Sequence, residues 1–268
     1  MRYPNGFPGW VDLATPDHDG ATAFYGSLFG WTPVDASPAP GMTYTMFHLG
    51  EELVCGMGSL TQEQQDAGMP SVWTTYVLVG DVDEMLIAAP GAGGSVVMPA
   101  MDIPTSGRMA MAADPSGAVF GLWQPDGHEG ADVFNVPGAL MWNELQTRDI
   151  AAALPFYEEL FGWRWENVPT DGGNYSVARL DAKGQGAEGV DTSVAGAMPM
   201  PPGVPEEAPS SWGVYFAVDV CDDAVETAQS LGASLVVGPM DIEAMRWAML
   251  TDPFGAMFYV MSSPGVED

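Results

Sequence analysis

The alternation of Val11, Asp12 and Leu13 predicts a short β-strand near the start of the chain. Apolar residues then recur at helical spacing over residues 21–28, and Gly30 follows where a helix would end. The pattern therefore predicts a strand followed directly by an amphipathic helix.

The same order of elements continues along the first 125 residues. Strands are predicted over residues 43–49 and 52–57, followed by a polar loop over residues 61–70. A second cycle has a strand at 73–79, a helix at 82–89, and strands at 95–98, 108–113 and 118–123. Each cycle reads as one βαβββ module, so the fold class is α+β.

Three motifs occur twice in the same order, and such self-similarity indicates an internal duplication. They are Trp-x-acid-Leu-x-Thr at Trp10 and Trp142, Phe-Tyr-x-x-Leu-Phe-Gly-Trp at Phe24 and Phe156, and Asp-Pro-x-Gly at Asp114 and Asp252. We expect a first domain at residues 1–125, a linker at 126–137, which lacks periodicity, and a second domain at 138–268.

Charge narrows the classes of partner. The chain has 36 acidic and 7 basic residues among 268, a formal net charge of −29. No basic cluster is present to neutralise phosphates, so nucleic acid and anionic membranes are excluded as partners. No segment has the length of a membrane span, and two cysteines are too few for a disulfide framework. We expect a cytoplasmic protein, a monomer or homodimer, whose partner is a small molecule.

The two repeated motifs in the helix and in the last hairpin resemble those of the vicinal oxygen chelate superfamily, which includes glyoxalase I, bleomycin-resistance proteins and extradiol dioxygenases. The resemblance covers residues 8–260 and implies four βαβββ modules whose curved mixed sheets form cavities. It also implies metal ligands on the first and last strand of a module. The residues at those positions are Trp10 and Trp142 on first strands, with Thr74 and Gly213 as approximate positions, and Gly121 and Tyr259 on last strands, with Gly56 and Gly196 as approximate positions.

None of these side chains is a usual ligand for zinc, nickel or iron, which bind imidazole, carboxylate or thiolate. The three histidines, His18, His48 and His128, are scattered along the chain. We therefore expect neither a metal nor another cofactor.

Two acids are candidates for catalysis. Asp12 and Glu144 stand two residues after Trp10 and Trp142, so strand geometry places them on the same, cavity-facing side. A carboxyl group in an aromatic pocket has a raised pKa and can act as a general acid or base. The alternative is a structural bond from each acid to a backbone amide or an arginine.

Scarce basic residues also recur between the halves. Arg108 corresponds to Arg246, and each is expected to hold the matching acid of its own half or an anionic group of a ligand. His48 corresponds to Arg179, and both are candidate ligand contacts, although an exposed strand position is the alternative for His48.

Aromatic and methionine residues recur on the predicted strands. The chain has eighteen Met and nine Trp, which suits an adaptable apolar cavity, although each residue could instead belong to the core. The candidate ligand contacts of this kind are Trp10, Tyr44, Trp73, Met111, Trp123, Trp142, Tyr175, Trp212 and Tyr259.

The two cavities are expected to differ. Gly121 in the first half corresponds to Tyr259 in the second, so Gly121 should leave open space in the first cavity. We expect that cavity to be the principal site, with Trp10 stacking on the ligand.

Three functional hypotheses remain open from the sequence. One is metal-independent binding of an aromatic or drug-like molecule, as in antibiotic sequestration or resistance. Another is a cofactor-free enzyme, of lyase, isomerase or cyclase type, that tailors a polyketide-like natural product with Asp12 or Glu144 as acid or base. The third is a structural domain without a ligand.

Overall fold

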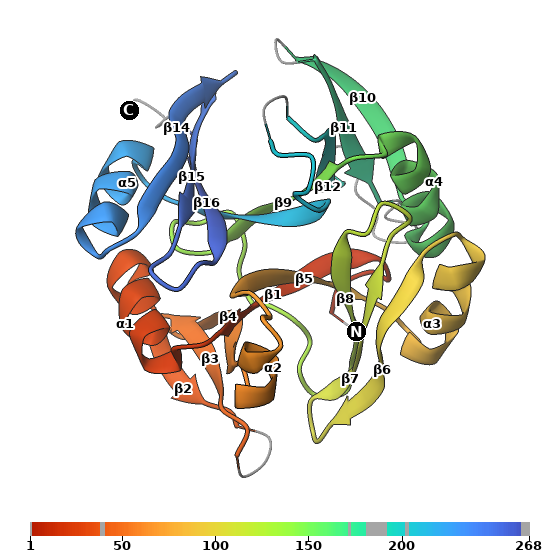
Figure 1. Cartoon of the computed structure of the whole chain (residues 1–268), viewed down its shortest axis with the longest axis horizontal. Coiled ribbons are helices and arrows are strands. Elements are labelled where there is room, and N and C mark those ends of the chain that lie inside the picture. Colours follow the sequence, from red (N-terminus) through yellow and green to blue (C-terminus); the bar gives the residue numbers. More distant parts are fainter. Residues whose placement is uncertain (1, 38–40, 171–172, 181–191, 202–203, 264–268) are drawn as a thin grey trace. The chain divides into compact units, whose positions relative to one another are not determined.

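The computed structural model of the chain describes residues 2–37, 41–170, 173–180, 192–201 and 204–263 (Figure 1). Within these residues each half forms one eight-stranded sheet of mixed strand direction, which confirms the predicted α+β fold. The strand order is β2-β3-β4-β1-β5-β8-β7-β6 in the first half and β10-β11-β12-β9-β13-β16-β15-β14 in the second. The two orders are identical once the labels are shifted by eight.

The elements of the first half are β1 (Phe7–Thr15), α1 (His18–Phe29), β2 (Thr32–Asp35), β3 (Tyr44–Leu49), β4 (Glu52–Ser59), α2 (Gln62–Asp66), β5 (Val72–Leu78), α3 (Val82–Gly91), β6 (Ser95–Ile103), β7 (Gly107–Ala113) and β8 (Val119–Pro125). Those of the second half are β9 (Leu140–Thr147), α4 (Ile150–Phe161), β10 (Arg164–Thr170), β11 (Gly173–Arg179), β12 (Ser193–Pro199), β13 (Ser211–Ala217), α5 (Cys221–Ser230), β14 (Ser234–Ile242), β15 (Met245–Thr251) and β16 (Met257–Ser262).

The sequence pattern missed some short or exposed elements. Strand β2 is exposed throughout and therefore has no apolar alternation to detect. Helix α2 lies inside the segment that we expected to be a loop, where Thr61 and Gln64 form a capping box. None of its five residues is buried, so only the cap could have indicated a helix.

Two compact units cut across the sequence halves. Unit 1 contains residues 1–10, 75–130 and 142–212, and unit 2 contains residues 11–74, 131–141 and 213–268. Each unit therefore combines one βαβββ module from the first half with one from the second. The two modules of one sequence half share a sheet, whereas the two modules that share a core come from different halves.

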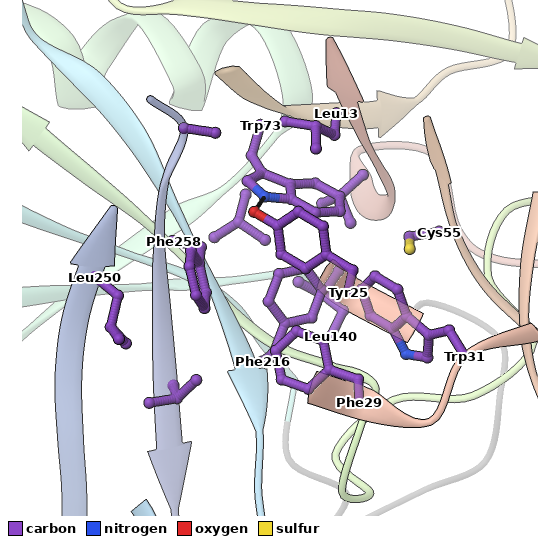
Figure 2. Close-up of a cluster of buried hydrophobic side chains, with 14 of the residues drawn as sticks. Leu13, Tyr25, Phe29, Trp31, Cys55, Trp73, Leu140, Phe216, Leu250 and Phe258 are labelled. Carbon is purple, nitrogen blue, oxygen red and sulfur yellow. Dashed lines mark hydrogen bonds between the residues drawn. The ribbon is translucent and has the colours of Figure 1, made fainter. Parts of the chain in front are cut away.

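The core of unit 2 forms where α1 packs beside α5, the red and blue helices of Figure 1. Figure 2 shows the fully buried ring of Tyr25 surrounded by Phe29, Trp31 and Phe216, with Phe258 nearby. The repeated helix motif is therefore a packing motif, since its aromatic residues fill this core.

Unit 1 repeats this arrangement with α3 beside α4. Tyr157 is fully buried and donates a hydrogen bond of 3.1 Å to Asp114 Oδ2, while Trp163 Nε1 donates one of 2.7 Å to the carbonyl oxygen of Gly6. Gly162 ends α4 with φ of 70°, a left-handed conformation that glycine adopts without steric cost.

Among the described residues, no helix combines the length and apolarity that crossing a lipid bilayer requires.

Candidate ligand-binding site

The first acid–tyrosine pair lies on the sheet face of unit 2 that points away from the helices. Val11 and Leu13 belong to the helix-side core, so the alternation of strand β1 turns Asp12 to the other face. There Tyr44 Oη donates a hydrogen bond of 3.2 Å to Asp12 Oδ2. Both side chains are only partly buried.

The second acid–tyrosine pair occupies the corresponding place in unit 1. Leu145 is fully buried in the core, while Glu144 faces away from it and is 7% exposed. Tyr175 Oη donates to Glu144 Oε2 at 2.9 Å, and Gln146 Nε2 donates to Oε1 at 3.1 Å. Trp142 Nε1 in turn donates to Tyr175 Oη at 2.8 Å. The structure thus brings three predicted site residues, Trp142, Glu144 and Tyr175, into one hydrogen-bond chain.

A glycine opposite Glu144 makes this chain possible. Gly196 on β12 is the register partner of Glu144 on the parallel strand β9. A Cβ atom at Gly196 would lie 1.8 Å from Tyr175 Oη and 2.7 Å from Trp142 Nε1, which is far inside van der Waals contact. Only glycine therefore allows the hydroxyl of Tyr175 to reach Glu144.

Electrostatics keep the Tyr175 hydroxyl protonated. Burial raises the pKa of Tyr175 above its usual value, and the neighbouring Glu144 carboxylate raises it further. The hydrogen bond from Trp142 acts in the opposite direction and is outweighed. Tyr175 is consequently a neutral hydrogen-bonding group at physiological pH.

The residues at the mapped metal positions do not fit a metal ion. They offer indole rings, a threonine hydroxyl, a phenol and glycines, as the sequence indicated. Within the described part of the chain, no group of three or more His, Cys, Asp or Glu side chains is arranged to hold a metal. The donor groups at these positions therefore give no support to a metal-dependent step.

The expectation of open space in front of Gly121 is wrong. A Cβ atom at this position would lie 2.1 Å from the ring of Tyr76, the register partner of Gly121 on β5, so the tyrosine fills the space. Trp10 is also not available for stacking, because it is 2% exposed and packs edge-on against His128 with ring centroids 4.3 Å apart. The sequence did not reveal that the linker would place His128 there.

Tyr259 lies in a comparable cluster in unit 2. Its ring stacks on Tyr215 with centroids 4.2 Å apart and an interplanar angle of 16°. The Tyr259 ring also covers Gly213, where a Cβ atom would approach within 2.8 Å. Tyr76, Tyr215 and Gln146 were missed as site residues, and Gly196 was named only as a mapped metal position. Parallel pairing of first and last strands gives a signal for Tyr76 and Tyr215.

Three predicted ligand contacts are structural instead. Trp73 and Trp212 belong to the helix-side cores, 3% and 7% exposed, and they donate hydrogen bonds of 3.0 Å to Tyr25 and Tyr157 respectively. Trp123 is likewise 5% exposed and donates to the carbonyl oxygen of His128 at 2.8 Å. These indole groups are committed to packing within their units.

Arg108 and Arg246 bind other acids than expected. Arg108 forms ion pairs with Asp83 at 2.9 Å and Asp102 at 2.6 Å. Arg246 forms equivalent pairs with Asp222 and Asp241 through all three of its guanidinium nitrogens. In both cases one partner is in the first turn of a helix, so the arginine joins a strand to that helix. Both arginines lie on the helix side of their sheets, whereas Asp12 and Glu144 face the other side. Neither arginine therefore binds these two acids.

The remaining predicted contacts lie on other parts of the two units. Arg179 pairs with Glu166 at 3.0 Å and lines a surface depression of about 410 Å³ with Arg164, Trp165 and Thr192. A second depression, of about 430 Å³, is lined by residues that include Cys221, Asp241 and Arg246. Neither depression contains an acid–tyrosine pair.

His48 and Met111 are the last of the predicted contacts. His48, on β3, is partly buried, and its Nδ1 atom has no hydrogen-bond partner among the described residues. Met111, on β7, is partly buried in register with Gly121, the position covered by Tyr76. The contact of His48 and Met111 with a ligand stays a prediction.

Known proteins are similar to this chain over nearly its whole length. The family model described as the Glyoxalase/Bleomycin resistance protein/Dioxygenase superfamily matches residues 8–122 and 139–260. CFP32 of Mycobacterium tuberculosis, which bears a glyoxylase name, is 40% identical over 265 residues, 97% of this chain and 96% of the relative. The anthracycline biosynthesis protein DnrV of Streptomyces peucetius is 36% identical over 273 residues, covering 97% and 94%.

Solved structures share the fold at low sequence identity. The Mn(II)-bound glyoxalase of Novosphingobium aromaticivorans has a TM-score of 0.63 at 16% identity, over 97% of this chain and 83% of that one. The 2,3-dioxygenase LapB of Pseudomonas sp. KL28 has a TM-score of 0.62 at 14% identity, over 97% and 93%. At these identities the likeness concerns architecture alone.

Proposed function

Because this chain belongs to the Glyoxalase/Bleomycin resistance protein/Dioxygenase superfamily, we propose that it binds a small aromatic molecule of the polyketide type without a metal ion. Sequestration or delivery of a natural product is the role that this binding would serve. The principal contacts are the two acid–tyrosine pairs on the sheet faces.

The observation that carries the proposal is the repeated contact of a tyrosine side chain with a glycine at strand positions where the family resemblance implies metal ligands. Gly196 is covered by Tyr175, and Gly121 by Tyr76, each at a position mapped to a metal ligand. A planar apolar ligand suits such a surface, because aromatic side chains contribute large contact areas and favour stacked or edge-on rings. The names of two relatives, both anthracycline biosynthesis proteins, support a planar polyketide as the ligand class.

The test is a titration of the purified full-length chain with hydroxylated anthraquinones. We expect a saturable change in tryptophan fluorescence and an increase in the melting temperature, both unchanged by EDTA. Binding to the native state raises apparent stability by about 2.7 kcal/mol when the ligand is at 100 times its Kd. Loss of binding after metal removal, restored by a divalent metal, would refute the metal-independent part of the proposal.

A cofactor-free enzyme is the second candidate, favoured by the tyrosine hydroxyl placed on each carboxylate. Asp12 or Glu144 would take a proton from a carbon or hydroxyl of the ligand, and Tyr44 or Tyr175 would hold that carboxylate in one orientation. The variants Asp12→Asn and Glu144→Gln separate the two functions. A binder keeps its affinity within about tenfold, which corresponds to one hydrogen bond, whereas a general-base enzyme loses about 10²–10⁴-fold in rate.

A further inference from the structure

We propose that Tyr175, held by Glu144 and Trp142, binds a hydrogen-bond donor of the ligand, a hydroxyl or ammonium group. This inference rests on the proposed function and specifies which group of the ligand is recognised. The residues that would bind this donor group come from the second half of the sequence and lie in unit 1.

The position of the hydroxyl is fixed by residues on two neighbouring strands. Tyr175 Oη lies against both Trp142 on β9 and Gly196 on β12. Any side chain larger than glycine at 196 would overlap the hydroxyl, since even a Cβ atom would be 1.8 Å away. The position of the Tyr175 hydroxyl therefore depends on the absence of a side chain at Gly196.

The hydrogen-bond directions decide what the hydroxyl can recognise. The single hydrogen of Tyr175 goes to Glu144 Oε2, and Trp142 Nε1–H occupies one acceptor position of the oxygen. A phenol oxygen can accept a further hydrogen bond through its remaining lone pair. A ligand carbonyl, which is only an acceptor, would find no hydrogen there, while a hydroxyl or ammonium group would find an acceptor next to a carboxylate.

Charge and orientation strengthen this preference. Gln146 donates to the other oxygen of Glu144 at 3.1 Å, so both carboxylate oxygens are held by neighbouring side chains. A donor bound to Tyr175 would also lie close to the negative charge, and the chain carries a formal net charge of −29. Both features favour neutral or cationic donors over anionic groups.

The first half supplies a matched comparison. Its Asp12–Tyr44 pair has a longer hydrogen bond of 3.2 Å, a shorter acid, and Ala14 in place of Gln146. Gly58, two residues beyond the register partner of Asp12, would place a Cβ atom 3.4 Å from the Tyr44 ring, an ordinary contact. Gly58→Ala is therefore a control for Gly196→Ala.

The experiment compares 2-hydroxyanthraquinone with 2-methoxyanthraquinone, which lacks the donor hydrogen, by titration of tryptophan fluorescence. We expect the wild type to bind the hydroxy compound more tightly, by about tenfold, the effect of one buried hydrogen bond. Tyr175→Phe and Gly196→Ala should remove this difference and leave the affinity for the methoxy compound unchanged. Gly58→Ala should keep it, and circular dichroism checks that each variant is folded.

The outcomes separate the two levels of the argument. If Tyr175→Phe binds both compounds as the wild type does, the inference about Tyr175 is overturned while aromatic binding stands. If neither compound binds to the wild type, the proposed function for planar aromatic ligands fails, and the recognition by Tyr175 fails with it. Should Gly196→Ala not fold, Glu144→Gln replaces it, and the same loss of preference is expected.

Discussion

Tyr25, on helix α1 of the first half, donates a hydrogen bond of 3.0 Å to Oδ2 of Asp252, in the hairpin turn of the second half. The other carboxylate oxygen of Asp252 accepts two bonds of 2.8 Å, from the backbone nitrogens of Phe254 and Ala256. The helix motif of one half is thus bonded to the turn motif of the other, inside unit 2. Tyr157 and Asp114 form the reciprocal bond in unit 1.

This relationship predicts that Tyr25→Phe destabilises the protein without affecting ligand binding. The substitution removes the buried hydroxyl that Asp252 and Trp73 both contact. Leaving such groups unsatisfied costs about 1–3 kcal/mol in the free energy of unfolding. Urea denaturation measures this loss, and Tyr157→Phe should give a similar value because its partners are equivalent. An unchanged midpoint in both variants would contradict a structural role.

Alkaline titration should show that three of the eight tyrosines resist ionisation in the native protein. Burial raises the pKa of Tyr25, Tyr157 and Tyr175, so these three should stay protonated in the native protein when exposed phenols ionise near pH 10. Absorbance at 295 nm reports ionisation. Tyr25→Phe should leave the native signal near pH 10 unchanged and lower the signal of the urea-unfolded protein.

The same shifts predict how stability changes at high pH. A tyrosine with a raised folded pKa contributes fully below the unfolded value of about 10, and that contribution is lost as the pH rises above it. Each such tyrosine makes the free energy of unfolding fall by about 1.4 kcal/mol per pH unit in this range. The fall should be shallower in Tyr25→Phe than in the wild type. Equal slopes would show that Tyr25 ionises in the folded protein.

Gly121→Ala should destabilise the protein because of the ring of Tyr76. The added Cβ atom would lie 2.1 Å from that ring, and such overpacking costs about 1–3 kcal/mol. Gly91→Ala is the control, since a Cβ atom there meets nothing within 4 Å. Thermal unfolding of both variants gives the comparison, and equal melting temperatures would mean that Tyr76 moves aside freely.

Chelation should leave the protein unchanged. The mapped ligand positions hold indole, hydroxyl and glycine groups, which give a metal no binding energy that could support folding. Dialysis against EDTA should therefore leave the melting temperature as it was, and elemental analysis should find less than stoichiometric metal. About one transition metal per chain that stabilises the fold would direct attention to Asp12 and Glu144.

The orientation of the two candidate acids could be predicted because strand geometry is local. The alternation of β1 and β9 alone placed Asp12 and Glu144 away from the core, and the structure agrees. The hydrogen bonds of these acids could not be predicted, because Tyr44 and Tyr175 reach them from other strands. The partners of Arg108 were missed for the same reason, since Asp83 and Asp102 come from a helix and a neighbouring strand.

The sequence by itself determined the modules, because the helix and turn motifs repeat and because local alternation and capping decide where a strand or helix forms. Only the tertiary structure decided which module shares a core with which: Tyr25 packs with Phe216 and Phe258 of the other half. It also decided that tyrosine rings fill the space in front of Gly121 and Gly196. Both depend on contacts between residues far apart in the chain, and no local pattern of apolar and polar positions encodes such contacts.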